Sequence, residues 1–495
     1  MNFEWNPIKF NILGIDFTRD LKDISDKNIE SKLYEMQREI NSWSKRDLTP
    51  FGRVVVIRTL VISKIVHILI SLPTPSKRMM LKINNMLFDF LWDGKPDKIK
   101  RCIAKQKLDN GGINMIDIDL FDKALKLTWI RRFISGNQKW KNLIIEINPN
   151  FEHLFLFGNI FIRRLAYAAE NPFWTHVMTY LGDFMYNCKI VSFEDFCATS
   201  FLYNSNYKIG GKVIENCALR NHGVYFINQL MNSDDNFYSL NEFNTKYNLN
   251  LDFLTYHSII RCIKTNSALD DLEKTNKKLH YQPAINVILK DRKGATNIYQ
   301  NLLTKSVEIK GKNKWCQLTG ISEEDWFGSF ALLKRTTCDT KLRWLQFRIL
   351  HHILTTNRSA SKFKPDQSDL CTFCKIESET IQHLIWHCEI VKSFYNNLIE
   401  LINRRCKHSH NMTINEQLVF FGSSEYIYTD KVFDTILLLS KSYVYRCKVQ
   451  DKDLNIRVFI KELFNRYCIE KCLRKNSQQF QSDWEAYADL FKCLM

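Results

Sequence analysis

Three cysteines and one histidine in a short segment have the residue types and spacing typical of a metal site. Cys371 and Cys374 are separated by two residues, His383 follows after eight more, and Cys388 after a further four. Two thiolates on one turn can hold a Zn²⁺ ion at about 2.3 Å, and two further ligands complete a tetrahedron. Four protein ligands leave no position open for a substrate, so the pattern predicts a structural zinc ion.

The fourth ligand stays open between Cys388 and His387. On a straight helix His387 lies four residues after His383 and shares its face. Cys388 lies five residues after His383 and points about 140° away. Cys388 can therefore join the site only if the helix ends or unwinds near Trp386, and helix geometry alone favours His387.

The segment directly before the cysteines has the pattern of an amphipathic helix over residues 341–354. Its apolar stripe consists of Leu342, Leu345, Ile349 and Ile353. A neighbouring face carries Lys341, Trp344, Arg348 and His352. Basic groups beside an aromatic ring can contact phosphates while the ring stacks on a base. The alternative is a core helix with a solvated basic side and a half-buried Trp344.

Several enzyme signatures are missing from the sequence. It contains no phosphate-binding Walker loop, no Gly-x-Gly-x-x-Gly, no His-Glu-x-x-His and no Gly-x-Ser-x-Gly. These motifs mark nucleotide hydrolases, dinucleotide enzymes, zinc proteases and serine hydrolases. We therefore expect no small-molecule substrate and no catalytic residue.

The composition predicts a helical, multidomain protein. The 495 residues are 45% hydrophobic and 13% aromatic, which excludes a disordered polar chain. That length accommodates about two to four domains. Only 16 glycines and 9 prolines are present, which favours helices over turn-dense β-structure.

Localisation can be predicted from the cysteines and from the apolar segments. The 15 cysteines accompany no secretory signal at Met1–Trp5, so we expect a reduced, intracellular protein of the cytoplasm or the nucleus. The longest apolar run, Val54–Leu72, is interrupted by Arg58, Lys64 and His67, so no membrane span is expected.

The net charge of +17 is concentrated in three windows. Residues 51–110, 331–365 and 441–475 carry net charges of +8, +7 and +6 when Lys and Arg are counted against Asp and Glu. Clustered positive charge on a folded, aromatic-rich chain favours a polyanionic partner. Charge kept for solubility is the alternative.

Periodicity along the chain predicts three regions. Residues 1–135 should form a compact helical domain: a short half-buried strand at 8–12, then helices from about 21, from Pro50 to Pro73, and over 76–92. Residues 136–320 should form a mixed α/β region with a hairpin at Gly210-Gly211 and a linker over 266–280. Residues 321–495 should be helical and carry the zinc site.

Four segments together resemble the C-terminal half of non-LTR (LINE-type) retrotransposon reverse transcriptases. The four are Phe10-Asn-Ile-Leu-Gly-Ile15; Trp43 with Leu48-Thr-Pro-Phe-Gly-Arg53; Asn110-Gly-Gly-Ile-Asn-Met-Ile116 with Ala124; and Lys341–Leu354 with the Cys/His segment. They are similar to the strand leading to the thumb, the thumb, the segment after the thumb and the zinc-binding domain of that family. The resemblance extends over nearly the whole chain.

The resemblance implies a thumb, a connector and a zinc-binding domain that bind RNA or DNA. It implies phosphate contacts from Arg53, Arg58 and Lys64 in the thumb, and nucleic-acid contacts from Lys341, Arg343, Trp344 and Arg348 beside the zinc ion. The family pattern of Cys-Cys-His-Cys favours Cys388 as fourth ligand.

The same resemblance bears on catalysis. In that family the polymerase carboxylates lie before the thumb, in an aromatic-Ala-Asp-Asp turn that this sequence does not match. Two-metal nucleotidyl transfer needs such carboxylates. We therefore expect a non-catalytic, nucleic-acid-binding part of an RNA-directed DNA polymerase used in target-primed retrotransposition. The alternative is a zinc-stabilised structural or protein-interaction module.

Overall fold

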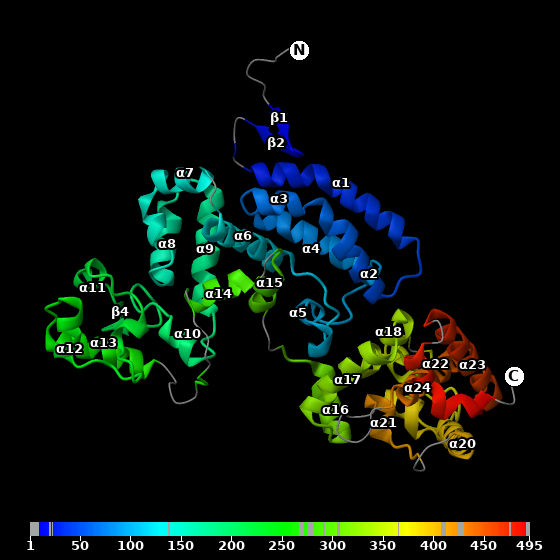
Figure 1. Cartoon of the computed structure of the whole chain (residues 1–495). Coiled ribbons are helices and arrows are strands. Elements are labelled where there is room, and N and C mark those ends of the chain that lie inside the picture. Colours follow the sequence, from blue (N-terminus) through cyan, green and yellow to red (C-terminus); the bar gives the residue numbers. More distant parts are fainter. Residues whose placement is uncertain are drawn as a thin grey trace. The chain divides into compact units, whose positions relative to one another are not determined.

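A computed structural model shows that the protein is mainly helical and multidomain, as the composition predicts (Figure 1). Sheet structure among the described residues is limited to two small antiparallel hairpins. The described residues are 9–18, 21, 23–136, 139–266, 272–274, 279, 281–290, 293–303, 307–364, 366–406, 412–422, 430–474 and 477–491. The predicted linker over 266–280 lies largely outside them.

The chain divides into two compact units that interleave along the sequence. Unit 1 comprises Met1–Trp43, Arg58–Leu87 and Ile116–Thr304. Unit 2 comprises Ser44–Ile57, Phe88–Met115 and Lys305–Met495. Segments of the first 115 residues therefore belong to each unit. The boundaries at residues 135 and 320 stay predictions.

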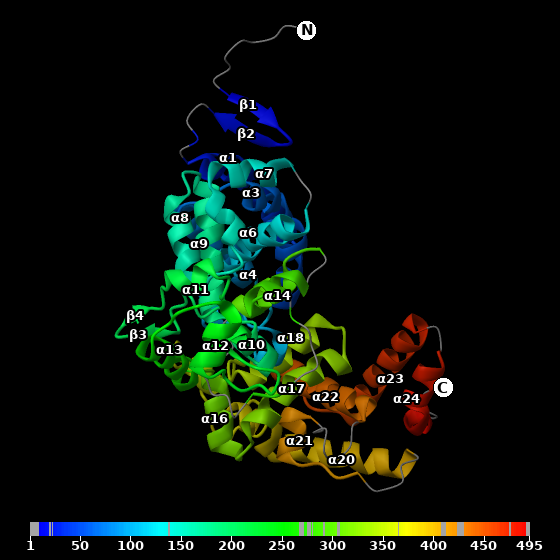
Figure 2. The same ribbon diagram turned by 60° about the vertical axis from the view of Figure 1, so that its left-hand side comes forward.

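Unit 1 is built from short and medium helices with two hairpins. Its elements are β1 Lys9–Ile12, β2 Ile15–Thr18, α1 Ile24–Ser44, η1 Ile57–Val61, η2 Ile62–Lys64, α3 Val66–Ser71, α4 Lys77–Trp92, α6 Ile118–Ser135, α7 Lys139–Ile147, η4 Pro149–His153, α8 Asn159–Ala168, α9 Pro172–Asn187, α10 Phe193–Cys197, β3 Lys208–Ile209, β4 Lys212–Val213, α11 Cys217–Asn221, η5 Ile227–Leu230, α12 Leu240–Tyr247, α13 Phe253–Thr265, α14 Pro283–Lys290 and α15 Thr296–Leu302. The last residues of α1 and α4 and the first residue of η1 belong to unit 2. Helices α8 and α9 lie side by side, with α6 against α9 (Figure 1, Figure 2).

The first strand is not half-buried, so that expectation was wrong. All four residues of β1 are exposed, and the strand pairs with β2 in an antiparallel hairpin. Phe10 and Phe17 face each other across the pair with ring centroids 5.5 Å apart. Cross-strand aromatic contact and pairing therefore stabilise this hairpin, with little burial of β1. The predicted hairpin at Gly210-Gly211 is present as β3 and β4.

The helix expected from Pro50 to Pro73 is interrupted. Helix α2 begins at Pro50, where the Thr49 hydroxyl accepts a hydrogen bond from the Gly52 amide. A π-turn (η1) and a 3-10 turn (η2) follow before the helical path resumes in α3. The stretch from Val54 to Ile65 is rich in β-branched residues, whose side chains lose freedom in an α-helix. The prediction of one continuous helix was therefore wrong.

Unit 2 holds the Cys/His segment, and the regular elements of its described part are helices joined by loops and turns. Its elements are α2 Pro50–Val56, α5 Arg101–Ala104, η3 Leu108–Asn110, α16 Lys310–Thr319, α17 Glu323–Thr336, α18 Thr340–Leu350, α19 Asn357–Ser361, η7 His383–His387, α20 Glu389–Arg405, α21 Glu416–Phe421, α22 Lys431–Gln450, α23 Ile456–Leu473, α24 Gln478–Trp484 and η8 Glu485–Phe491. Helices α17, α18 and α22 pack against one another (Figure 1, Figure 2).

The Gly111-Gly112 pair belongs to the core of unit 2. Gly111 has a φ of +76°, and its carbonyl accepts a hydrogen bond from Nε2 of buried His351 at 2.7 Å. A Cβ atom on Gly112 would lie 2.0 Å from the carbonyl oxygen of Gln106. Only glycine fits at position 112, and Gly111 joins this segment to the end of α18.

Candidate metal centre and basic cluster

Cys371, Cys374, His383 and Cys388 converge on one point of unit 2. One ligand atom from each lies within 4.8 Å of every other. The Cys371 and Cys388 sulfurs are 3.9 Å apart, and the Cys374 sulfur is 3.3 Å from His383 Nε2. Tetrahedral coordination with Zn–S bonds of about 2.3 Å needs sulfurs about 3.8 Å apart. The four side chains fit a tetrahedral metal ion, and they could hold one.

The two cysteines of the first pair sit on a tight turn. The Lys375 amide donates to the Cys371 carbonyl at 3.0 Å, and the Cys371 amide donates to the Glu377 carbonyl at 2.7 Å. Lys375 has a φ of +57°, which reverses the chain directly after Cys374. Both sulfurs consequently face the same side of the turn.

The second pair is positioned by a π-turn. In η7 the helix widens, and the Cys388 amide donates to the His383 carbonyl five residues before it, at 2.9 Å. Cys388 then adopts an extended conformation (φ −61°, ψ 125°), which turns its sulfur toward Cys371. This is the unwinding that Cys388 needs in order to join the site.

His387 lies outside the cluster. Its Nε2 is 3.3 Å from a carboxylate oxygen of Glu416, and its side chain is 49% exposed. The choice favoured by straight-helix geometry is therefore not the one that the structure places with the other three ligands. A π-turn adds a residue to the turn and changes which side chains share a face.

The surroundings of Cys388 favour a thiolate. A hydrogen bond from the Cys371 thiol lowers the pKa of Cys388 below its usual range, against the opposing effect of burial. The amides of Val391 and Ile390, at the start of α20, act in the same direction. A cysteine at a helix N-terminus is readily ionised, and the thiolate is the form that binds metal.

His383 has a carboxylate behind it. Its Nδ1 lies 3.0 Å from Glu377 Oε2, while its Nε2 faces the sulfurs. Metal-bound histidines commonly donate their second N–H to a carboxylate, which fixes the tautomer and the ring orientation. Glu377 lies within ion-pair distance of this ligand, but His383 Nδ1 makes no hydrogen bond to any described residue.

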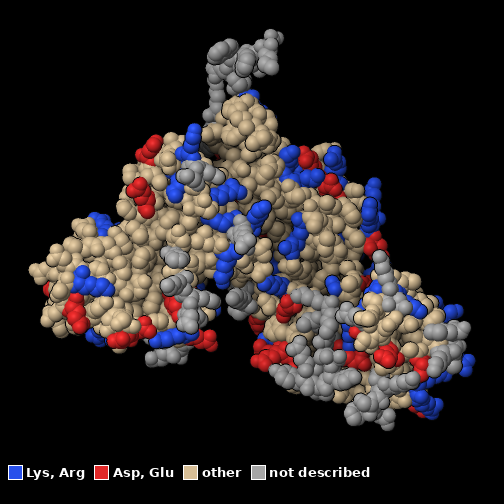
Figure 3. Space-filling view, in the orientation of Figure 1, with Lys and Arg blue, Asp and Glu red and all other residues tan. Residues whose placement is uncertain are grey.

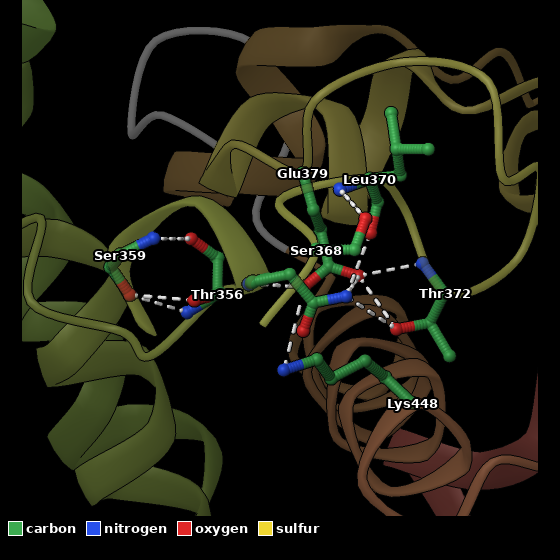
Figure 4. A network of polar contacts seen from close by, with 8 residues as sticks. Thr356, Ser359, Ser368, Leu370, Thr372, Glu379 and Lys448 are labelled. Carbon is green, nitrogen blue, oxygen red and sulfur yellow. Dashed lines mark hydrogen bonds and ion pairs between the residues drawn. The ribbon is translucent and has the colours of Figure 1, made fainter. Parts of the chain in front are cut away.

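Buried Glu379 connects the cysteine turn to helix α19 (Figure 4). Its Oε2 accepts from the Thr372 amide at 3.0 Å and from the Thr372 hydroxyl at 2.9 Å. Its Oε1 accepts from the Asn357 amide at 2.8 Å and lies 3.4 Å from Lys448 Nζ. The Asn357 side-chain amide also donates to the Leu370 carbonyl at 2.8 Å. We call this set the Glu379 network.

A basic and aromatic cluster forms where the segment after α4 meets α18. Lys98 Nζ lies 5.7 Å from the ring centroid of Trp344, and the Arg348 guanidinium lies 5.9 Å from it. Arg348 also lies 5.1 Å from the ring of Tyr445. We call Lys95, Lys98, Trp344, Arg348 and Tyr445 the Trp344 cluster.

The cations of the Trp344 cluster repel one another. The pKa of Lys98 is lowered first by burial and then by the charges of Arg348 and Lys95. Within the described part of the chain, Arg348 Nε is buried without a hydrogen-bond acceptor. Lys95 lies 3.8 Å from Asp93, a weak contact. An anion beside Trp344 would relieve this repulsion.

The other predicted contact residues are placed differently. Buried Arg53 donates to the carbonyls of Leu48 and Phe90 and to Asp93, so its donors are used within unit 2. The Arg343 side chain donates to the carbonyls of Leu333 and Thr337. Both arginines hold structure together here.

Lys341, Arg58 and Lys64 remain nearer to solvent. Lys341 is exposed and lies 2.6 Å from Asp47. Arg58 is exposed in unit 1, and half-buried Lys64 lies 3.5 Å from Glu39. Lys and Arg side chains also gather on the visible face of unit 1 around α6 (Figure 3).

Many cations of the third basic window are paired or buried. Arg446 contacts Glu462, Arg466 contacts Glu470, and Arg474 contacts Asp483. Lys448 lies beside Glu379, and Lys441 is fully buried. The net charge of a window therefore does not show which of its cations are available to a partner.

Comparison with known proteins leaves the family open, because no protein-family model matches this chain. Among the described residues, no helix is both long enough and apolar enough to span a bilayer.

Three functional candidates were missed from the sequence. Lys98 and Tyr445 lie in two of the basic windows, but nothing in their local pattern singles them out. Glu379 reads as a polar residue in a loop, although it is fully buried. Its place between the CxxC pair and His383 was the only available signal.

Proposed function

We propose that this protein binds RNA or DNA through unit 2, and that a structural Zn²⁺ ion holds part of that surface in shape. The Trp344 cluster is the contact surface. The chain would serve as the thumb, connector and zinc-binding part of a LINE-type reverse transcriptase. In a complete enzyme of that kind it would hold nucleic acid during RNA-directed DNA synthesis.

The observation that carries the proposal is the clustering of cations around the half-buried ring of Trp344. Lys98 and Arg348 flank one ring, and Lys95 adds a third positive charge. The three cations repel one another when no anion is bound. Phosphates would neutralise these charges, and a base could stack on the indole. A neutral or cationic partner would leave the repulsion in place.

Zinc is the metal that the ligand set supports best. Three thiolates and one imidazole at tetrahedral spacing suit Zn²⁺, and a closed set of four suits a structural role. When bound, the ion would cross-link the cysteine turn to the start of α20. The residues around it orient the ligands, and none of them activates a substrate.

Charge reversal at Lys98 tests the contact surface. Lys98→Glu should weaken binding to a fluorescently labelled single-stranded RNA, and Lys461→Glu is the matched control. Lys461 is likewise exposed in unit 2, on α23. Loss of one phosphate contact should make the slope of log affinity against log salt shallower by about 0.7. Equal affinities for the two variants would contradict the proposal.

A zinc-stabilised protein-interaction module is the second candidate function. The exposed side chains Ile376 (79%) and Ile390 (45%) beside the metal ligands favour it. In that case Ile376→Ser would abolish binding to a protein partner, while Lys98→Glu would leave that binding unchanged. RNA affinity that is insensitive to every substitution in the Trp344 cluster would favour this function.

A further inference from the structure

A second group of cations, none of which belongs to the Trp344 cluster, lies around helix α19. Arg358, Lys362 and Lys364 are exposed on α19 and the turn that follows it. The Nζ of Lys314, in α16, lies 3.3 Å from Nδ1 of His352. The pKa of Lys314 is lowered by burial and then by the charges of Arg358 and Lys362. Within the described residues, none of the four has an ion-pair partner.

An aromatic ring stands among these cations. Phe363 is 87% exposed, between Lys362 and Lys364 in the sequence. Its backbone is fixed, because the amides of Phe363 and Lys364 both donate to the Ala360 carbonyl at 3.0 Å. An exposed phenyl ring in water is unfavourable, and a stacked base would cover it. Bases are free to stack in this way in a single strand and are already stacked in a duplex.

Helix α19 is too short to be stable by itself, because it has five residues. Its position is fixed at its start by the Glu379 network. Glu379 accepts hydrogen bonds from Asn357 on one side and from Thr372, between Cys371 and Cys374, on the other (Figure 4). The cysteine turn and α19 therefore share one buried carboxylate.

We propose that Glu379 holds the segment Arg358–Lys364 in the orientation in which Phe363 stacks on an unpaired base and the neighbouring cations contact its phosphates. This rests on the proposed function and adds to it a preference for single strands and a dependence on the metal. When the ligands hold Zn²⁺, the cysteine turn is fixed. Through its hydrogen bonds to Thr372 and Asn357, Glu379 then fixes the position of α19, so it is a positioning residue.

The first test compares Phe363→Ala with Phe253→Ala in the full-length, zinc-loaded protein. Phe253 is a matched control, 63% exposed on α13. Affinity is measured for a labelled single-stranded oligouridylate and for an RNA duplex. Phe363→Ala should weaken single-strand binding about tenfold, as expected for one stacked base. It should leave duplex binding unchanged, and Phe253→Ala should leave both unchanged. The proposal would be overturned if Phe363→Ala bound single strands as tightly as the wild-type protein does. It would also be overturned if Phe363→Ala lost as much affinity for the duplex as for the single strand.

The second test addresses Glu379. Glu379→Gln keeps the shape of the side chain and removes the charge that faces Lys448. Zinc content should stay at the wild-type value, single-strand affinity should fall to that of Phe363→Ala, and the double variant should bind no more weakly. Hydrogen exchange of the Ala360 amide should become faster. Wild-type affinity in zinc-loaded Glu379→Gln would refute the positioning role.

Two further variants keep the outcomes distinct. If Glu379→Gln does not load zinc, Asn357→Ala replaces it, since it removes the side-chain links from α19 to Leu370, Thr372 and Glu379. Unchanged single-strand affinity in Asn357→Ala then refutes a positioning role of the Glu379 network. Lys98→Glu reports on the proposed function alone. If Lys98→Glu lowers RNA affinity and Phe363→Ala does not, only the further inference is refuted. Binding to phosphatidylserine vesicles is the alternative outcome. If Phe363→Ala abolishes vesicle binding and leaves RNA affinity unchanged, the segment binds a lipid surface and the proposal is overturned.

Discussion

Lys441 provides a stability prediction whose magnitude follows from the structure. Its ammonium group is fully buried in α22, donating to Gln346 Oε1 at 2.6 Å and to the Val419 carbonyl at 2.7 Å. Burial lowers the pKa of Lys441 to about 7, against an opposing effect of Asp434. In the unfolded chain the pKa returns to about 10.4.

The stability of unit 2 should therefore rise with pH. Above pH 7 the folded chain holds Lys441 mostly neutral, while the unfolded chain still binds the proton, so raising the pH favours the folded state. Between about pH 7.5 and 9.0 this one group should add about 2 kcal/mol to the free energy of unfolding. The contribution is lost as the pH falls toward 7.

Lys441→Met isolates this effect. The variant keeps the length of the side chain but cannot titrate, and it leaves Gln346 and Val419 without a donor at every pH. Urea unfolding of zinc-loaded wild type and variant, followed by tryptophan fluorescence, gives the difference in unfolding free energy at each pH. That difference should grow by about 2 kcal/mol from pH 7.5 to 9.0. Lys392→Met, at an exposed position of α20, should show no such change. Parallel pH profiles for wild type and Lys441→Met would refute the reasoning.

Three other predictions concern the metal and the core. Cys371→Ser should abolish stoichiometric zinc binding, measured by atomic absorption, and lower the urea midpoint, whereas His387→Ala should retain the metal; metal loss in His387→Ala would contradict the assigned ligand set. Gly112→Ala should cost about 2–4 kcal/mol of unfolding free energy, because its Cβ would meet a carbonyl oxygen. Gly328→Ala, in a helix with open space around the new Cβ, should leave the unfolding free energy unchanged or raise it by up to about 1 kcal/mol. A stabilising Gly112→Ala together with a destabilising Gly328→Ala would show that the packing is misassigned.

The sequence contained enough information to predict the helical class and three of the four clustered ligands. CxxC followed by a histidine is a local pattern. Ligands this close in sequence can meet in space with little dependence on the rest of the fold. The fourth ligand was harder, because choosing between Cys388 and His387 depends on a π-turn that shifts the helical register by one residue. The Cys-Cys-His-Cys family pattern pointed to Cys388 where straight-helix geometry did not.

Tertiary placement explains what the sequence could not predict. Arg53 and Lys441 look like surface cations, yet folding buries both and uses their donors within unit 2. Lys98 reaches Trp344 although almost 250 residues separate them in the sequence. Charge counted along a chain cannot distinguish these cases, because partners far away in sequence decide which cations stay available.

The most direct test of the proposed function is the salt dependence of RNA binding by the zinc-loaded protein. Three phosphate contacts from Lys95, Lys98 and Arg348 should lower single-strand affinity about twentyfold as salt rises from about 50 to 200 mM. Charge reversal at Lys98 should make this dependence shallower, and Lys461→Glu should not. Binding that is absent, or that is independent of salt in the wild-type protein, would contradict the proposal that unit 2 binds nucleic acid.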